Sequence, residues 1–412
     1  MARKREHSLV LAPGAFGFNG GGGIALGASI SAPFAQTAAI LGAGGLDYAL
    51  YDAATMDRMW QEARGQSATN PNQPVGLIVG REKQQAKTFT QMMDAQPEKL
   101  SNPGGPFVSL AGVTVFNGAT SALVSGAIEI TGNVANGFPG ISINTSGLIA
   151  GRLYEVKARG RRGTSTSGII IRPNEPVTEV ALSTSSQSDL DGVLRFVATA
   201  ASTGLIAVIN SAAGSGSGGT VFVSSWSIKE VPAHYANQIT NADRPTLTNG
   251  QLDFSLSATA NLLTDWTAQA GANCIIAQIS VPAVISAIQT FTGAQTSDRF
   301  RFEIGTNGVL AAALGPTGYA AASGGDLRNQ QVIVGLSWDG AVARLFENAI
   351  MSDERAQVGT MPTTMPFALG AVNVNSARAQ YFNGQAKRLA FGKTALTLAQ
   401  FQTIRNEWLA TA

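Results

Sequence analysis

Short strands separated by turn residues fill residues 104–231, and this pattern most limits what the chain can fold into. Gly, Asn, Ser and Pro stand between the strands at the spacing typical of a β-sandwich. In the last strand Phe222, Ser224, Trp226 and Ile228 alternate with Val221, Val223, Ser225 and Ser227, and we expect the Trp226 face to point inward. The predicted strands are 107–110, 114–116, 127–131, 140–144, 153–160, 168–172, 178–182, 192–198, 204–210 and 221–230.

The same pattern of short predicted strands separated by turn residues continues in residues 234–412. The stretch 331–349 predicts a hairpin, because Asp339-Gly340 is a strong turn signal between two alternating strands. Thr397 can cap a closing amphipathic helix whose Leu398, Phe401, Ile404, Arg405 and Trp408 lie on one stripe. No short fixed repeat is seen, so two sandwiches fit better than a propeller or a solenoid.

Composition narrows the possible partners and cofactors. Only 13% of the residues are charged and the net charge is +2, so nothing global directs the chain to nucleic acid. One cysteine, Cys274, excludes an internal disulfide framework, and two histidines, His7 and His234, make a zinc site a poor prospect. We therefore expect no metal and no cofactor. No apolar run approaches membrane-helix length, and the short run 9–12 does not make a secretory signal, so we expect a cytoplasmically made chain without membrane insertion.

Two segments precede the first sandwich. Residues 1–45 are glycine-rich, and we interpret them as an anchor that becomes ordered on a partner or between subunits, with Phe16, Phe18 and Phe34 as plugs; a disordered tail is the alternative. Residues 46–103 are a connecting shoulder. Within it, 52–65 predicts a capped helix with Met56, Met59, Trp60 and Ala63 on its apolar stripe.

Several short motifs lie in the last third of the chain. They are 234–238, 243–247, 252–254, the Trp338-Asp339-Gly340 turn, the Phe382-Asn383-Gly384 strand, and 393–397 with the helix that follows. This set resembles the concanavalin A-like, laminin G-like lectin domains of tailed-phage structural proteins. The stretch from 59–62 through 73–77 is similar to the segment that stands ahead of the lectin-like part in those proteins. Residues 151–156 and 226–231 resemble parts of a carbohydrate-binding module.

The resemblance spans roughly residues 50 to 412 and implies a virion spike or fibre of a tailed phage or a phage-like gene transfer agent. It divides the chain into an anchor (1–45), a shoulder (46–103), a carbohydrate-binding-module-like jelly roll (104–232) and a lectin-like sandwich (233–412). Relatives often continue the 252–256 motif with acidic residues, whereas this chain has Ser255-Leu256-Ser257-Ala258, which argues against a calcium site of the laminin G type.

Sugar binding is the chemistry that this pattern favours, because aromatic faces pack on pyranose C–H surfaces while amides and charged groups take the hydroxyls. The candidates in the second sandwich are Trp338, Tyr319, Trp266, Tyr381, Asn348 and Asp326, and those in the first are Tyr154 and Arg159, followed by Arg161 and Arg162. A tryptophan in a β-protein is more often part of the core than a sugar platform.

Catalysis is not expected. A glycosidase needs two carboxylates held across a groove, and the acids of this chain are scattered; Asp189 and Asp191 come closest but lie in a turn. Neither histidine suits a serine hydrolase, and His234 beside Pro232 is interpreted as structural.

We therefore predict a non-enzymatic attachment protein that lies on the surface of a virion and binds host-cell polysaccharide. It is expected to form a homo-oligomer, most simply a trimer, and to contact other virion proteins through its amino terminus. A capsular polysaccharide depolymerase and a purely structural decoration protein are the alternatives.

Overall fold

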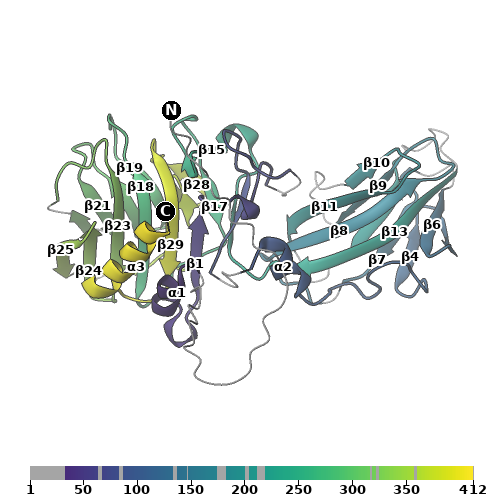
Figure 1. Cartoon of the computed structure of the whole chain (residues 1–412), viewed down its shortest axis with the longest axis horizontal. Helices are drawn as coiled ribbons and strands as arrows, with labels where there is room; N and C mark the ends of the chain where they lie inside the picture. Colours follow the sequence, from purple (N-terminus) through teal and green to yellow (C-terminus); the bar gives the residue numbers. More distant parts are fainter. Residues whose placement is uncertain are drawn as a thin grey trace, which may run out of the picture. The chain divides into compact units, whose positions relative to one another are not determined.

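The computed structural model describes residues 33–63, 67–82, 87–132, 137–145, 147–173, 182–199, 204–210, 219–315, 318–321, 324–356 and 360–411. Strands are the main regular structure of these residues, with short helices between them (Figure 1). Among the described strands the sheets are almost wholly antiparallel, since β27 alone pairs in parallel, with β19. The predicted mainly β, sandwich-forming class is therefore confirmed. Phe16 and Phe18 lie outside the described residues.

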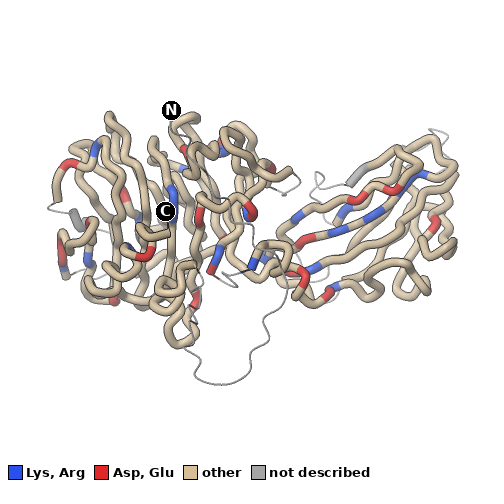
Figure 2. The backbone as a smooth tube through the Cα atoms, in the orientation of Figure 1, with Lys and Arg blue, Asp and Glu red and all other residues tan. Residues whose placement is uncertain are grey.

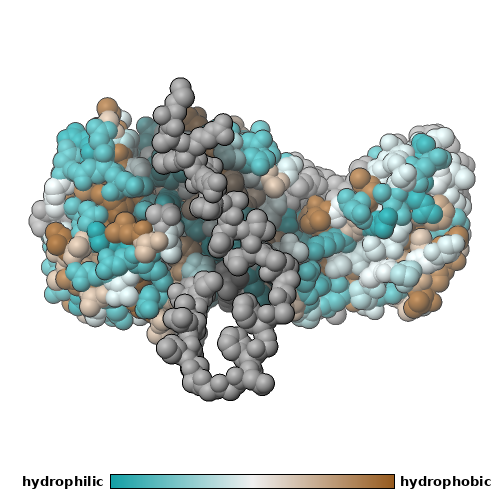
Figure 3. Space-filling view, in the orientation of Figure 1, coloured by the Kyte–Doolittle hydropathy of each residue, from teal (hydrophilic) through white to brown (hydrophobic). Residues whose placement is uncertain are grey.

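The first sandwich is built from two five-stranded antiparallel sheets. One has the order β10-β9-β12-β7-β4, with β10 Leu182–Thr184, β9 Ile169–Pro173, β12 Leu205–Ile209, β7 Gly140–Ile143 and β4 Val113–Phe116. The other has the order β11-β8-β13-β6-β5, with β11 Leu190–Val197, β8 Leu153–Arg162, β13 Gly219–Glu230, β6 Ala127–Gly132 and β5 Thr120–Val124. Val115 of β4 and Leu123 and Val124 of β5 are exposed, and Figure 3 shows hydrophobic surface at the end of the first sandwich where Figure 1 labels β4 and β6.

The core of the first sandwich contains Trp226, which is 1% exposed and packs edge-on against Phe107. The expectation that Trp226 points inward holds, but the alternation before it is wrong. A β-bulge between Val223 and Ser225 shifts the register of β13 against β8, so that Val223 and Trp226 both face the core. Phe222 lies on the outer face instead, with the Arg161 guanidinium 4.1 Å from the centre of its ring.

The second sandwich has an eight-stranded sheet in the order β15-β16-β29-β18-β23-β24-β25, with β1 also paired to β29. Its strands are β15 Thr246–Thr248, β16 Gln251–Asp253, β29 Gln385–Gly392, β18 Asn273–Ser280, β23 Gln331–Trp338, β24 Val342–Glu347, β25 Ile350–Ala356 and β1 Tyr48–Asp52. The predicted Asp339-Gly340 hairpin joins β23 and β24, where Trp338 faces Ala343 and Gly340 adopts a φ of 103°.

The facing sheet runs β2-β3-β14-β17-β26-β19-β20-β21-β22, and β27 and β28 branch from β19. Its strands are β2 Met59–Trp60, β3 Leu77–Val79, β14 Tyr235–Asn237, β17 Leu262–Thr264, β26 Ala368–Leu369, β19 Gln289–Gln295, β20 Arg299–Ile304, β21 Leu310–Leu314, β22 Gly318–Ala321, β27 Val372–Val374 and β28 Ala377–Ala379. Trp266, Phe291, Phe367 and Phe391 are among the buried rings of the core between the two sheets.

The shoulder supplies strands to this second sandwich. β1 pairs with β29, and β3 pairs with β14, so segments on both sides of the first sandwich in sequence build the same two sheets. The helix predicted over 52–65 is wrong. A single 3₁₀ turn, η2 Met56–Arg58, leads into β2, because Met59 and Trp60 pair with β3 and tertiary pairing overrides local helical spacing.

Two helices cover the outer face of the eight-stranded sheet. α3 (Leu398–Ala410) begins as predicted at Thr397, which forms a capping box with Gln400, and its Phe401, Ile404 and Trp408 are buried. α1 (Ala35–Leu41) lies beside α3, and Glu407 accepts hydrogen bonds from the backbone N–H groups of Gln36 and Thr37. Because this sheet is covered on both faces, β1 and β18 are buried along almost their whole length, and their burial does not alternate.

The remaining short elements lie in the connections. They are the 3₁₀ turns η1 Ala43–Gly45 and η3 Asn241–Asp243 and the helix α2 Phe89–Asp94, which starts at a capping box of Thr88 and Gln91. Phe89 of α2 and Trp60 of β2 meet edge-on, and the Arg195 guanidinium lies 3.8 Å from the centre of the Trp60 ring. The shoulder thus contacts the outer face of β11 in the first sandwich.

A buried arginine joins the beginning and the end of the described chain. Arg388 of β29 donates hydrogen bonds to Asp52 of β1 (3.1 Å) and to the carbonyl oxygens of Trp408 and Thr411 at the end of α3. The Phe34 ring covers the same guanidinium, at 5.1 Å. Phe34 is 2% exposed, so in this structure it fills a place in the core of its own chain. This is an alternative to the predicted role as a plug in a partner.

Replacement of Phe34 by alanine tests which role dominates. If the ring belongs to this chain's own core, Phe34→Ala lowers the free energy of unfolding of the isolated protein by about 3 kcal/mol, because a cavity opens beside Arg388. Leu46→Ala is the matched control, because Leu46 is 39% exposed. This substitution should change the free energy of unfolding only slightly. Urea unfolding measures both variants. An unfolding midpoint for Phe34→Ala equal to that of the control would favour the anchor instead.

Candidate functional site

A groove of about 550 Å³ lies on the outer face of the sheet that contains β4, β7, β12 and β9. Strand alternation builds its floor. In β12 the side chains of Leu205, Ala207 and Ile209 point into the core, so those of Ile206 and Val208 point outward. The groove is lined by Phe116, Asn117, Phe138, Ser142, Ile170, Arg172, Ile206 and Val208.

The register of the strands arranges these residues in two rows across the sheet. Phe116 lies opposite Gly140, Gly140 opposite Val208, and Val208 opposite Ile170, which gives an apolar row. In the next row Ser142 lies opposite Ile206, which lies opposite Arg172. A Cβ atom on Gly140 would come within 3.0 Å of the Phe116 ring and closer to Val208, so a glycine here keeps the floor of the groove open.

A loop holds an aromatic ring at the rim. Phe138 is 47% exposed and adopts a φ of 51°, a left-handed conformation that is rare for a bulky side chain. Asn117, with a φ of 52°, donates hydrogen bonds from Nδ2 to the carbonyl oxygens of Gly137 (2.9 Å) and Phe138 (3.2 Å). Strained backbone of this kind persists where the surrounding structure imposes it, which is common at binding sites.

The groove contains one positive charge among its described lining residues, the guanidinium of Arg172. Arg172 is half-buried, and among the described residues that line the groove there is no carboxylate. Within the described part of the chain no hydrogen bond or ion pair of its guanidinium is found. The site therefore offers an aromatic face, an apolar floor, a hydroxyl, an amide and a cation.

The opposite face of the first sandwich differs in its electrostatics. A shallower hollow of about 340 Å³ there contains Arg159, Arg161 and Asp189. Arg159 lies 3.4 Å from Asp189 and 3.5 Å from Asp191, and Arg161 lies 3.7 Å from Asp189. Lys and Arg alternate with acids along these strands in Figure 2. The sequence-predicted Arg159 is thus exposed but already paired with acids.

Three predicted aromatic residues lie in the protein core. Trp338 and Trp266 are 1% and 0% exposed, and Trp266 stacks on Phe391 with ring centres 5.1 Å apart. Tyr154 is also fully buried, and its hydroxyl accepts a hydrogen bond from the backbone N–H of Ile149. A ring without an exposed face has no surface on which a sugar can stack, so none of the three can serve as a sugar platform.

The other predicted residues are not brought together. Tyr381 is half-buried beside Thr290, Asn348 occupies the turn between β24 and β25 with a φ of 53°, and Asp326 is exposed and pairs with Arg328. Tyr319 is in β22, but its side chain lies outside the described residues. None of these is a lining residue of the groove.

Sequence reasoning missed Phe116, Phe138 and Arg172 as a group. Phe138 stands between Gly137 and Pro139, outside any alternating strand, and such an isolated aromatic in a turn is a signal that could have been used. Arg172 follows the core residue Ile171 in β9, so strand alternation indicates only that its side chain points away from the core.

The described acids do not form a catalytic pair in this groove. Asp189 and Asp191 share Arg159 on the opposite face, and Glu303 is buried beside Arg301 in the second sandwich, where burial raises the pKa of its carboxyl. Within the described ranges no three His, Cys, Asp or Glu side chains are close enough to hold a metal ion. No described helix is long and apolar enough to cross a membrane.

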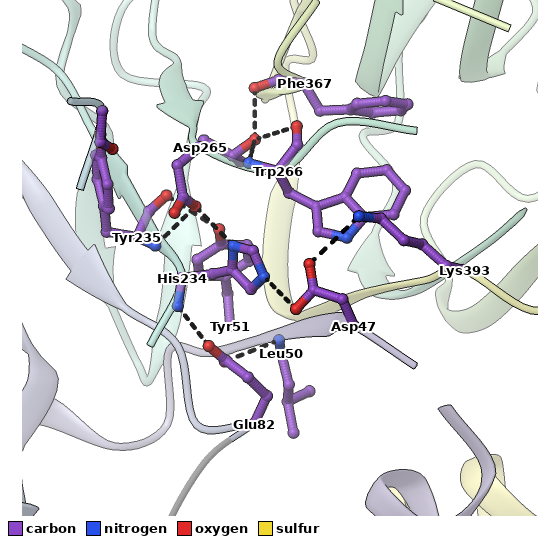
Figure 4. Close-up of polar contacts among 12 residues, drawn as sticks. Asp47, Leu50, Tyr51, Glu82, His234, Tyr235, Asp265, Trp266, Phe367 and Lys393 are labelled. Atoms are coloured by element: carbon purple, nitrogen blue, oxygen red, sulfur yellow. Dashed lines mark hydrogen bonds and ion pairs between the residues drawn. The ribbon is translucent and has the colours of Figure 1, made fainter. Parts of the chain in front are cut away.

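A second polar cluster surrounds His234, where the chain returns from the first sandwich (Figure 4). Its two ring nitrogens lie 3.0 Å from Asp265 and 3.1 Å from Asp47, and Asp47 also contacts Lys393. Burial opposes charge on the ring, but the hydrogen bonds to Asp265 and Asp47 outweigh it and raise the pKa of His234 to about 10.

The hydrogen bonds of this cluster connect separate segments of the chain, which indicates a structural role. Glu82 accepts hydrogen bonds from the backbone N–H groups of His234 and Leu50, so the loop after β3, strand β1 and the start of β14 are tied together. Burial raises the pKa of Glu82, whereas the hydrogen bond from His234 holds the pKa of Asp47 well below its usual range. His234 is 8% exposed, which suits the structural role expected from the sequence.

This cluster predicts a fall in stability at alkaline pH. Because the pKa of His234 rises from 6.5 to about 10 on folding, its stabilisation is complete below pH 6.5 and is lost as the pH approaches 10. His234→Gln removes that slope and lowers the free energy of unfolding near neutral pH by about 3 kcal/mol. Urea unfolding of both proteins between pH 6.5 and about 10 measures this dependence of the free energy of unfolding on pH.

Arg328→Gln is the control, since it breaks an exposed ion pair with Asp326 and should leave the pH profile unchanged. A His234→Gln profile parallel to that of the unsubstituted protein would show that His234 does not titrate in this window.

Comparison with known proteins gives structural likeness without a family. No known protein family matches the chain, and no curated protein matches it. Among solved structures it is similar to the carbohydrate-binding module CBM40 of a Ruminococcus gnavus IT-sialidase bound to α2,3-sialyllactose, at 17% identity over 34% of this chain and 83% of that one, with a TM-score of 0.29.

Two other solved structures have similar scores. A heptameric SAP-like pentraxin from Limulus polyphemus is 14% identical over 34% of this chain and 72% of its own, with a TM-score of 0.28. A leech intramolecular trans-sialidase is 17% identical over 34% of this chain and 24% of its own, also with a TM-score of 0.28. Scores this low do not bear on function.

Proposed function

We propose that this protein binds a carbohydrate in the groove of the first sandwich. The observation that carries the proposal is the exposed Phe138 ring, held in a left-handed conformation at the rim of an apolar floor with polar groups around it. Pyranose rings present C–H faces that pack on aromatic and aliphatic side chains, while their hydroxyls need hydrogen-bond partners. Asn117, Ser142 and Arg172 supply such partners.

The dimensions of the site agree with this ligand. The apolar row from Phe116 to Ile170 crosses four adjacent strands, a span of roughly 14 Å, which suits a short oligosaccharide better than a single small molecule. The groove is also open along the outer face of a sheet, where an extended chain can lie.

Substitution of the rim aromatic tests this function. Phe138→Ala should weaken glycan binding about tenfold, because a stacking face is lost, while the fold is retained since Phe138 is 47% exposed and lies in a loop. Phe222→Ala is the matched control, a phenylalanine on the outer face of the opposite sheet, and should bind normally. Binding is measured on a glycan array and then by calorimetry with the glycans retained.

Equal binding by both variants would remove the groove from consideration. Absence of any bound glycan, together with particles that fall apart without the protein, would favour a structural decoration protein. Release of reducing ends from a bound polysaccharide would identify a depolymerase instead.

The biological setting that we propose is a spike or fibre of a phage or phage-like particle that attaches to host polysaccharide. The motif resemblance over roughly residues 50 to 412 supports it, and so does a charge near neutrality that directs the chain to no nucleic acid. Such proteins gain avidity as homo-oligomers, most simply trimers. Light scattering gives the oligomeric state, and labelled images of purified particles give the location; a monomer absent from particles would contradict this setting.

A further inference from the structure

We propose that the sugar bound in this groove carries a carboxylate, and that Arg172 binds it. This inference rests on the proposed function, since it names the class of glycan that the same groove accepts. It starts from the position of Arg172 in the row Ser142, Ile206, Arg172. The guanidinium reaches the groove from the strand β9, two strands away from the Ser142 hydroxyl, a separation of roughly 10 Å.

The surroundings of Arg172 make an anion its preferred partner. Its neighbours on the floor, Ile206 and Ile170, are apolar, so they offer no hydrogen-bond acceptor and partly remove the side chain from water. A cation in such a position is stabilised by an opposite charge. The planar guanidinium fits a carboxylate with two parallel hydrogen bonds, which neutral sugar hydroxyls cannot match.

Three other arginines of the same sandwich have an acidic partner among the described residues, in contrast to Arg172. Arg195 pairs with Glu155, and Arg159 and Arg161 lie within 3.7 Å of Asp189. In each case the chain supplies its own carboxylate. Among the described residues that line the groove there is no carboxylate for Arg172, which lines the same groove as the exposed ring of Phe138. We assign the role of that partner to a carboxylate of the ligand.

The two ends of the groove then have separate tasks. Phe116 and Phe138 hold the apolar face of the sugar, and Arg172 selects those glycans that present a carboxylate toward β9. Binding should therefore weaken as salt is added, while the stacking contribution should not.

The experiment compares the full chain with Arg172→Gln, Arg172→Lys and the control Arg159→Gln on an array of neutral, sulfated, uronic-acid and sialylated glycans. Polyuronate oligosaccharides and their carboxyl-reduced forms are included, because reduction replaces the carboxylate by a hydroxymethyl group and keeps the rest of the sugar. We expect carboxylated glycans to bind at least tenfold more tightly than their reduced forms. Arg172→Gln should abolish that preference, Arg172→Lys should keep part of it, and Arg159→Gln should keep all of it.

The outcomes separate this inference from the proposed function. If neutral or only sulfated glycans bind, and Phe138→Ala weakens them while Arg172→Gln does not, the carboxylate inference is wrong and the groove remains a glycan site. If no glycan binds, or if Phe138→Ala changes nothing, both proposals fail. Thermal unfolding of Arg172→Gln checks that the variant is folded, which is expected because Arg172 has no hydrogen bond or ion pair to lose among the described residues.

Discussion

The buried guanidinium of Arg388 is the interaction on which the second sandwich depends. It binds Asp52 from the beginning of the described chain and the last carbonyl groups of α3 from its end, beneath the ring of Phe34. A buried cation is costly unless it is fully paired, so β1, β29 and α3 must be assembled together. This requirement explains why residues before the first sandwich belong to the fold of the residues after it.

The His234 cluster performs a similar task where the chain re-enters that sandwich. Asp47 precedes β1, Glu82 follows β3, and Asp265 follows β17, so one imidazole connects segments far apart in sequence. The first sandwich is therefore inserted in sequence between strands of the second. Its own core is separate and contains Trp226 and Tyr154, which leaves its outer sheet face free to carry a groove.

Local signals predicted local features well. Asp339-Gly340 marked a real hairpin, and Thr397 marked a real helix start with the expected buried stripe, since turn and cap preferences act within a few residues. The bulge in β13 could not be seen, because one extra residue changes which face Phe222 occupies without changing the pattern of the sequence. Met59 and Trp60 have the spacing of a helix in the sequence, but they form a strand because they pair with β3.

The candidate site also combines features that the local sequence determines with features that depend on tertiary structure. The sequence by itself determined a mainly β chain of two sandwiches, sparse in charge, with aromatic residues as the natural place to look for sugar contacts. Only the tertiary structure decided which aromatics are available: Trp266 and Trp338 lie in the core, whereas Phe138 lies at the rim of a groove that Arg172 also lines. Strand alternation indicates that a residue faces one side of a sheet, but which side meets solvent, and which distant residue lies across from it, depends on register and on the packing of the second layer.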